Sequence, residues 1–67
     1  MIWAAIRSGM EREHIRSIVE LADRTGINKS TLTHTRRKNP NSFILYELKQ
    51  IDRVLHFTES EWKEVRA

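Results

Sequence analysis

The sequence predicts a compact all-α domain. Apolar residues recur at spacings of three and four and seldom alternate strictly, which is the period of helices rather than of strands. Glycine and proline are scarce, with two and one in 67 residues, so few positions interrupt helical structure. A chain of this length forms one domain. We therefore expect residues 1–67 to fold as a single domain with five helices, over about 2–13, 18–25, 29–38, 44–55 and 59–66.

The first expected helix carries one apolar stripe. Ile2, Ile6 and Met10 follow one another at i, i+4 and i+8, and Ala5 lies beside them on the same face. Gly9 lies inside this stretch, where it costs about 1 kcal/mol relative to alanine. We therefore expect the helix to be weak or bent at that position.

The second and third expected helices have clear signals at their ends. Ser17 can cap the second helix through its hydroxyl, and Gly26 stands where a helix C-terminus favours a left-handed residue. Asn28 can cap the third helix, in which only Leu32 is clearly apolar. The third helix is therefore expected to be held against its neighbour and to leave its other face free.

The fourth expected helix has the strongest apolar period in the chain and is expected to be the core helix. Pro40 in the loop over residues 39–42 separates it from the third helix. Its stripe is formed by Ile44, Leu48, Ile51 and Leu55 and is widened by Leu45 and Val54. His56 or Phe57 is expected to end this helix. Thr58 and Glu61 then form a capping box that opens the fifth helix.

Positive charge is concentrated in one third of the chain. The net charge is +3. Residues 24–46 hold five cations and no acid, whereas the remainder holds seven cations and nine acids. A local basic patch on a nearly neutral scaffold indicates a polyanionic partner, although a solvated face without a partner has the same composition.

Several classes of site are not expected. The chain has no cysteine, its three histidines do not have metal-ligand spacing, and no cofactor motif is present, so we expect neither a metal nor a cofactor. Ser30 and His34 stand at i and i+4 without an orienting acid, and enzyme activity is therefore not expected. No apolar run approaches the ~20 residues of a membrane span, and no secretory signal is evident. These observations favour a cytoplasmic location.

The spacing around Gly26 indicates two helices joined by a tight turn. Ala22 is small enough for the third helix to cross close over it, and Ile27 and Leu32 can wedge the two helices at a steep angle. The exposed face of the third helix would then be formed by Lys29, Ser30, Thr33, His34 and Arg37, with Thr31 and Arg36 at its edges.

The stretch ELADRTGINKSTLTHTRRKNP resembles the helix-turn-helix of lambda-repressor-like (Xre/Cro-type) DNA-binding domains. The later stretch ILYELKQIDRVLHFTESEW resembles the fourth and fifth helices of that five-helix fold, so the resemblance covers nearly the whole chain. Small single-domain members of this family are common in phages and mobile elements. Two positions depart from the family pattern: Ile18 stands where a glutamine is frequent, and Thr35 stands where an aliphatic residue is usual.

The resemblance implies that the third helix lies in the major groove of double-stranded DNA. It implies base contacts from Lys29, Ser30, Thr33 and His34. It implies phosphate contacts from Ser17, Thr31, Arg36, Arg37, Lys38 and Asn39.

Two functions follow as hypotheses. The first is a transcriptional regulator of the Cro or repressor type that binds a palindromic operator as a homodimer. The dimer surface would come from the region of the fifth helix, with Phe57, Trp62 and Val65. The alternative is an antirepressor that docks on a partner repressor and blocks its DNA binding. Ile18, expected to be an exposed apolar residue, and the polar Thr35 favour this alternative.

Overall fold

The computed structural model describes residues 2–66, which contain helices and no strand. The elements are α1 (Ile2–Arg12), α2 (Ile18–Thr25), η1 (Thr31–Thr35), α3 (Arg36–Lys38), η2 (Pro40–Ser42), α4 (Leu45–Leu55) and α5 (Glu59–Arg66). Residues 29–30, η1 and α3 form one continuous helical stretch, residues 29–38, which we call the third segment. For these residues the prediction of an all-α fold is confirmed.

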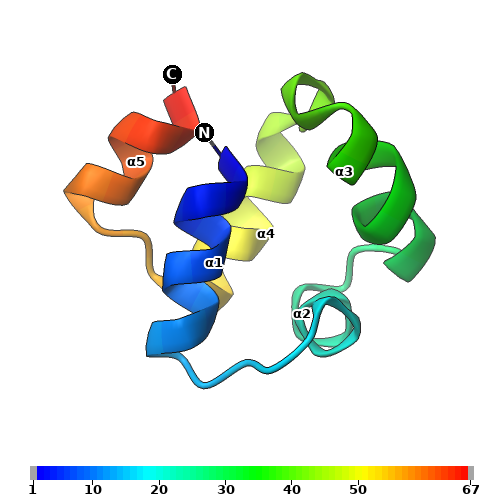
Figure 1. Cartoon of the computed structure of the whole chain (residues 1–67), viewed down its shortest axis with the longest axis horizontal. Coiled ribbons are helices and arrows are strands. Elements are labelled where there is room, and N and C mark those ends of the chain that lie inside the picture. The colour runs from blue at the N-terminus through cyan, green and yellow to red at the C-terminus, as the bar shows by residue number, and fades with distance from the viewer. Residues whose placement is uncertain (1, 67) are drawn as a thin grey trace.

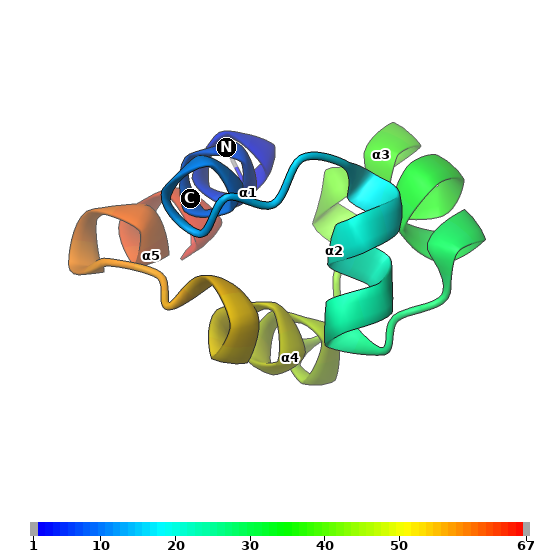
Figure 2. The ribbon, with the colours of Figure 1, turned by 90° about the horizontal axis from the view of Figure 1, so that it is seen from below.

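Helix α4 connects the two ends of the molecule. Helices α1 and α5 pack side by side at one end, and α2 lies at the other end with the third segment (Figures 1 and 2). Helix α4 packs against both α1 and α2 and lies behind α1 in the view of Figure 1. The third segment is therefore at the edge of the fold, where one of its faces can remain free.

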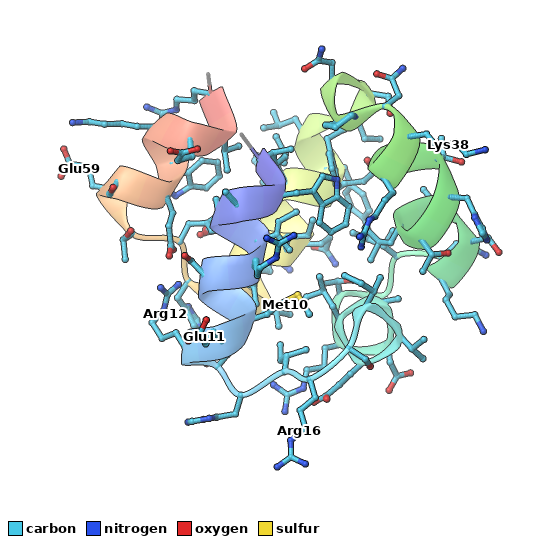
Figure 3. The ribbon with its side chains drawn as sticks, viewed as in Figure 1. Met10, Glu11, Arg12, Arg16, Lys38 and Glu59 are labelled. Carbon is cyan, nitrogen blue, oxygen red and sulfur yellow. The ribbon has the colours of Figure 1, made fainter. Side chains whose placement is uncertain are left out.

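At the centre of the core are large side chains from four helical elements. Those that are fully buried are Ile6, Leu21, Leu32, Ile51 and Leu55. Burial of each contributes about 1.5–3 kcal/mol. Leu32 is the sole buried residue of the third segment, as its sequence led us to expect. Met10 is half-buried and points from α1 toward α2 (Figure 3).

Gly9 permits a close approach of α1 to α4. Helix α1 continues through this position, from Ile2 to Arg12, so the expected weakness is not a break. A Cβ atom added at Gly9 would lie 2.9 Å from Cβ of Leu55 and 3.0 Å from its Cδ1. Because such a contact is too short, glycine is required here by packing rather than by backbone conformation.

Two histidines in the left-handed conformation end helices. His14, with φ 58°, follows α1, and His56, with φ 53°, follows α4. The expectation that His56 ends its helix is confirmed. The expected capping box of α5 is also present, because Thr58 N–H donates to Glu61 (3.0 Å) and Glu61 N–H donates to the Thr58 hydroxyl (3.1 Å).

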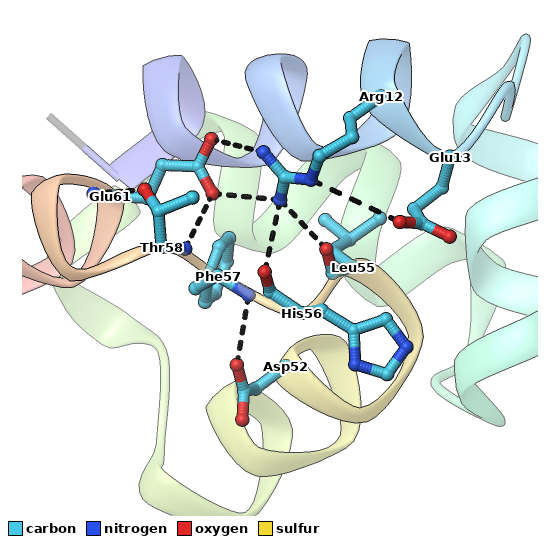
Figure 4. Close-up of polar contacts among 8 residues, drawn as sticks. All are labelled: Arg12, Glu13, Asp52, Leu55, His56, Phe57, Thr58 and Glu61. Atoms are coloured by element: carbon cyan, nitrogen blue, oxygen red, sulfur yellow. Dashed lines mark hydrogen bonds and ion pairs between the residues drawn. The ribbon is translucent and has the colours of Figure 1, made fainter.

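Arg12 links α1 to the end of α4 and to α5 (Figure 4). Its Nη1 and Nη2 each lie 2.8 Å from an oxygen of Glu61. Its Nη2 also donates to the carbonyl oxygens of Leu55 (2.8 Å) and His56 (3.1 Å). The hydrogen bond from Arg12 lowers the pKa of Glu61 below its ordinary value. One guanidinium thus caps α4 and anchors the fifth helix.

The start of α4 differs from the expected core stripe. Ile44 is 54% exposed and Leu45 is 65% exposed. Ile44 is the residue before the helix and has an extended backbone, with φ −100° and ψ 159°, so it does not continue the helical stripe. Leu45 lies two residues before the buried Glu47, which places it about 200° around the helix. Both side chains therefore face solvent.

Within residues 2–66, none of the helices combines the length and the apolar character that crossing a membrane requires.

Candidate nucleic-acid interface

Local hydrogen bonds set the geometry between α2 and the third segment. The Ser17 hydroxyl accepts the N–H of Glu20 at 3.1 Å and caps α2. Gly26 has φ 77°, and a Cβ atom there would meet nothing within 4 Å, so the left-handed backbone is what requires glycine. Asn28 Oδ1 accepts the N–H groups of Ser30 (2.8 Å) and Thr31 (3.2 Å). The two caps and the glycine turn that the sequence predicts are confirmed.

The third segment presents a polar face to solvent. Leu32 is fully buried and holds the segment against the core. The predicted contact residues that are exposed on this segment are Lys29, Ser30, His34, Arg37 and Lys38. Thr33 is half-buried, and its hydroxyl donates to the carbonyl oxygen of Lys29 at 2.9 Å. The Thr33 oxygen can still accept a hydrogen bond from outside.

The middle of the third segment is a π-helix. The N–H of Arg36 donates to the carbonyl oxygen of Thr31, five residues earlier. In a regular α-helix Thr35 would share a face with Leu32, three residues before it. In the wider winding Thr35 is exposed, and Arg36 is half-buried. The π-helix therefore explains how a polar residue is accommodated at position 35.

The side chain of Arg36 binds other residues of the protein, and the expectation that it contacts a phosphate is therefore corrected. Its Nε and Nη2 donate to the two carboxylate oxygens of Glu47 at 2.8 and 2.9 Å, and its Nη1 donates to the Ser42 hydroxyl at 3.1 Å. Burial alone would raise the pKa of Glu47. The hydrogen bonds from Arg36 and from the N–H of Ile44, together with the charge of Arg36, outweigh burial and lower that pKa. The Arg36 guanidinium is thus occupied by internal partners.

Arg37 is held on an aromatic platform. Its guanidinium carbon lies 5.6 Å from the ring centroid of Trp3, a cation–π distance. Trp3 is itself fixed, because its Nε1 donates to the carbonyl oxygen of Arg36 at 3.1 Å and its ring packs against Phe43 with centroids 5.7 Å apart. Arg37 nevertheless remains exposed, so its charge is available to a partner.

Arginines from three separate parts of the chain line one pocket of about 230 Å³, which we call the arginine pocket. Arg7 comes from α1, Arg16 from the loop before α2, and Arg37 from α3. All three are exposed, and within residues 2–66 none forms an ion pair with a carboxylate. Ser17, the cap of α2, also lines the pocket. Unpaired cations around a pocket attract anions.

The sequence did not single out Arg7 and Arg16 as site residues. The sole local signal is that Arg7 stands four residues after Trp3 and so shares its helix face. Arg16 directly precedes the cap of α2 and extends beyond the ribbon into solvent (Figure 3). Tertiary packing places positions 7, 16 and 37 around the same pocket, and no local sequence pattern predicts this arrangement.

The remaining predicted phosphate contacts differ in accessibility. Ser17, Lys38 and Asn39 are exposed, and Lys38 projects outward from α3 (Figure 3). Thr31 is half-buried, and its N–H is occupied by Asn28.

The expected dimer or partner surface at the fifth helix belongs in large part to the core. Phe57 is 8% exposed and meets the ring of Trp62 edge-on at 5.3 Å, so the expectation that it forms an outer surface is corrected. Trp62, Val65 and Ile18 are half-buried and pack against the core. The large apolar side chains that are exposed within residues 2–66 are instead Val19, Ile44, Leu45 and Tyr46.

Within the described residues, no three His, Asp or Glu side chains are grouped so that they could hold a metal ion. No protein-family model, no curated protein and no solved structure matches this chain.

Proposed function

We propose that this protein is a sequence-specific DNA-binding transcriptional regulator of the Cro or repressor type. The observation that carries this proposal is the position of the arginine pocket beside the polar face of the third segment. Arg37 belongs to both features, because it lies in α3 and lines the pocket. A helix with a free polar face and adjacent unpaired cations is suited to a DNA groove and its flanking phosphates.

The two parts of this surface would have different tasks. Lys29, Ser30, Thr33 and His34 would read base edges in the major groove, where lysine can donate to guanine and hydroxyls adapt to several bases. Arg7, Arg16 and Arg37 would hold the phosphate backbone, together with Ser17, Lys38 and Asn39. Arginine suits this task because its planar guanidinium matches phosphate geometry. Phosphate contacts would set the register, and base contacts would set the sequence preference.

A second function has one observation in its favour. Ile44, Leu45 and Tyr46 are three consecutive apolar residues that are all more than half exposed. Such a cluster favours contact with a protein, as in an antirepressor that docks on a partner repressor. That function requires no affinity for DNA, so DNA binding separates the two proposals.

Charge-matched variants test the proposed DNA contacts. Arg16→Ala and Arg37→Ala should weaken binding to all duplexes and should reduce the slope of log K against log salt by about one each. Lys63→Ala on α5 removes the same charge from an exposed position outside the proposed interface and should leave that slope unchanged. Lys29→Ala should instead relax the sequence preference. Equal effects of Arg37→Ala and Lys63→Ala would show that only net charge matters, and the proposed interface would be wrong.

A further inference from the structure

The arginine pocket has an apolar side that contacts with DNA phosphates would not use. Trp3, Met10 and Ile18 line the pocket together with the three arginines and Ser17. These three apolar side chains are half-buried and pack against the core, whereas the arginines are exposed. The pocket is therefore apolar on the side nearer the core and cationic on the side nearer solvent.

Ile18 is the lining residue that a phosphate contact explains least. It is the first residue of α2 and directly follows the cap Ser17. Phosphates are held by cations, hydroxyls and backbone N–H groups, and the side chain of isoleucine has no such group. Beside Arg16 and Ser17, this side chain instead provides a surface from which water is released when an apolar body covers it.

Trp3 and Met10 supply the rest of the apolar side. Trp3 is held in place by the hydrogen bond from its Nε1 to the carbonyl oxygen of Arg36 and by the contact of its ring with Phe43. Met10 points from α1 toward α2 (Figure 3), and its unbranched thioether can adapt to a flat aromatic body. The apolar side thus combines one fixed side chain with one that can adjust.

The cationic side lacks internal partners. No Asp or Glu is among the described residues that line the pocket, and Arg7, Arg16 and Arg37 form no ion pair within residues 2–66. A guanidinium pairs with a carboxylate through two parallel hydrogen bonds, and it also stacks on aromatic rings. A ligand that joins an aromatic body to a carboxylate therefore matches both sides of the pocket.

The volume of the pocket limits the size of such a ligand. The pocket measures about 230 Å³. A cavity of about 150 Å³ can hold a benzene molecule. Sites for drug-sized ligands take about 300–1,000 Å³. The pocket therefore suits a body of one or two rings, and it is too small for a nucleotide.

We infer that the arginine pocket binds a small aromatic carboxylate, and that the bound acid competes with DNA. The rings lie against Trp3, Met10 and Ile18, and the carboxylate pairs with the arginines. The competition rests on the proposed function, because it requires that the same arginines hold DNA phosphates. The binding of the acid does not depend on that function and can be measured without DNA.

The test is a titration of the isotope-labelled protein with 1-naphthoate, followed by NMR. The chain has two tryptophans, and their indole N–H signals separate the pocket from the rest of the fold. The signal of Trp3 should shift and reach saturation. The signal of Trp62, which packs against Phe57 and does not line the pocket, should stay in place.

Two further ligands separate the contributions of charge and rings. The neutral 1-naphthamide keeps the rings and should bind about tenfold or more weakly, because it cannot form a charge-assisted hydrogen bond. Acetate keeps the carboxylate and should also bind about tenfold or more weakly, because it covers little apolar surface. Equal affinity for 1-naphthoate and either of these ligands would overturn the inference.

Matched variants locate the site. Arg7→Gln should weaken 1-naphthoate binding about tenfold, whereas Lys63→Gln on α5 removes the same charge outside the pocket and should have no effect. Ile18→Ala should weaken binding about threefold or more. Val19→Ala is its control, because Val19 is 55% exposed on α2 and does not line the pocket.

The absence of a saturable shift at Trp3, or equal effects of Arg7→Gln and Lys63→Gln, would overturn the binding of the acid. With DNA present, saturating 1-naphthoate should lower the affinity for the duplex about tenfold or more. An unchanged affinity for DNA with the pocket occupied would overturn the competition. Failure of the protein to bind any duplex would instead overturn the proposed function, while a saturable shift at Trp3 would still support the binding of the acid.

Discussion

The guanidinium of Arg36 and the carboxylate of Glu47 form a paired contact, with Nε–Oε1 at 2.8 Å and Nη2–Oε2 at 2.9 Å. Arg36 lies at the end of the π-helical stretch, and Glu47 lies in the first turn of α4. The pair therefore links the third segment, which has one face exposed to solvent, to α4. It also removes one cation from the set that can contact a partner.

This pair predicts a specific pH dependence of stability. The pKa of Glu47 lies below its ordinary value of 4.5, so its contribution to stability is present above that value and is lost as the pH falls through the folded pKa. Glu47→Gln should lower the melting temperature at neutral pH and should make its fall under acid conditions shallower. Thermal unfolding followed by circular dichroism between about pH 3 and pH 7 measures both effects.

Glu59→Gln provides the control, because Glu59 is exposed in the first turn of α5. It should unfold with the acid dependence of the wild type. If Glu47→Gln also keeps the wild-type acid dependence, the pair does not contribute as described.

The close approach of α1 to α4 makes a prediction for Gly9. Gly9→Ala should destabilise the protein, because the added Cβ would lie 2.9 Å from Cβ of Leu55. Overpacking costs about 1–3 kcal/mol and outweighs the gain of about 1 kcal/mol in helix propensity. Urea denaturation measures the change in the free energy of unfolding. Ser8 is the exposed neighbour of Gly9, and Ser8→Ala should leave the stability unchanged or raise it. A Gly9→Ala protein that is more stable than the wild type would refute the packing argument.

The left-handed conformation of His56 predicts a stabilising substitution. His56→Gly should raise the free energy of unfolding by about 1 kcal/mol, because glycine accepts φ 53° without strain. The bond from Arg12 to the carbonyl oxygen of residue 56 does not depend on the side chain. His34→Gly in the third segment should have the opposite sign, since glycine costs about 1 kcal/mol inside a helix. Equal signs for the two substitutions in chemical denaturation would contradict this account of the end of α4.

Features that depend on neighbouring residues could be predicted from the sequence. The capping roles of Ser17 and Asn28, the glycine turn at Gly26 and the capping box at Thr58 each rest on hydrogen bonds or backbone angles within three residues. The isolated Leu32 likewise indicated a segment held by a single buried side chain.

Features that depend on tertiary contacts could not be predicted. From the sequence, Gly9 indicated only a weak helix. Its role in packing depends on Leu55, which lies far along the chain and could not be identified as its neighbour. Arg36 and Arg37 have the same charge and are adjacent in the sequence. They differ because Arg36 forms an ion pair with Glu47 and so has a structural role. Phe57 is buried by Trp62 and the core, whereas Leu45 faces solvent despite its place in an apolar run. The arginine pocket likewise exists only because α1, the loop before α2 and α3 meet.

The salt dependence of DNA binding tests the proposed function most directly. Affinities are measured by fluorescence anisotropy at several salt concentrations, for a duplex selected by the protein and for a scrambled duplex of the same composition. If each domain neutralises about four to five phosphates, log K for the selected duplex falls against log salt with a slope near −4. The selected duplex should also bind more tightly at every salt concentration. A slope near zero, or equal affinity for both duplexes, would contradict a role in reading DNA sequence.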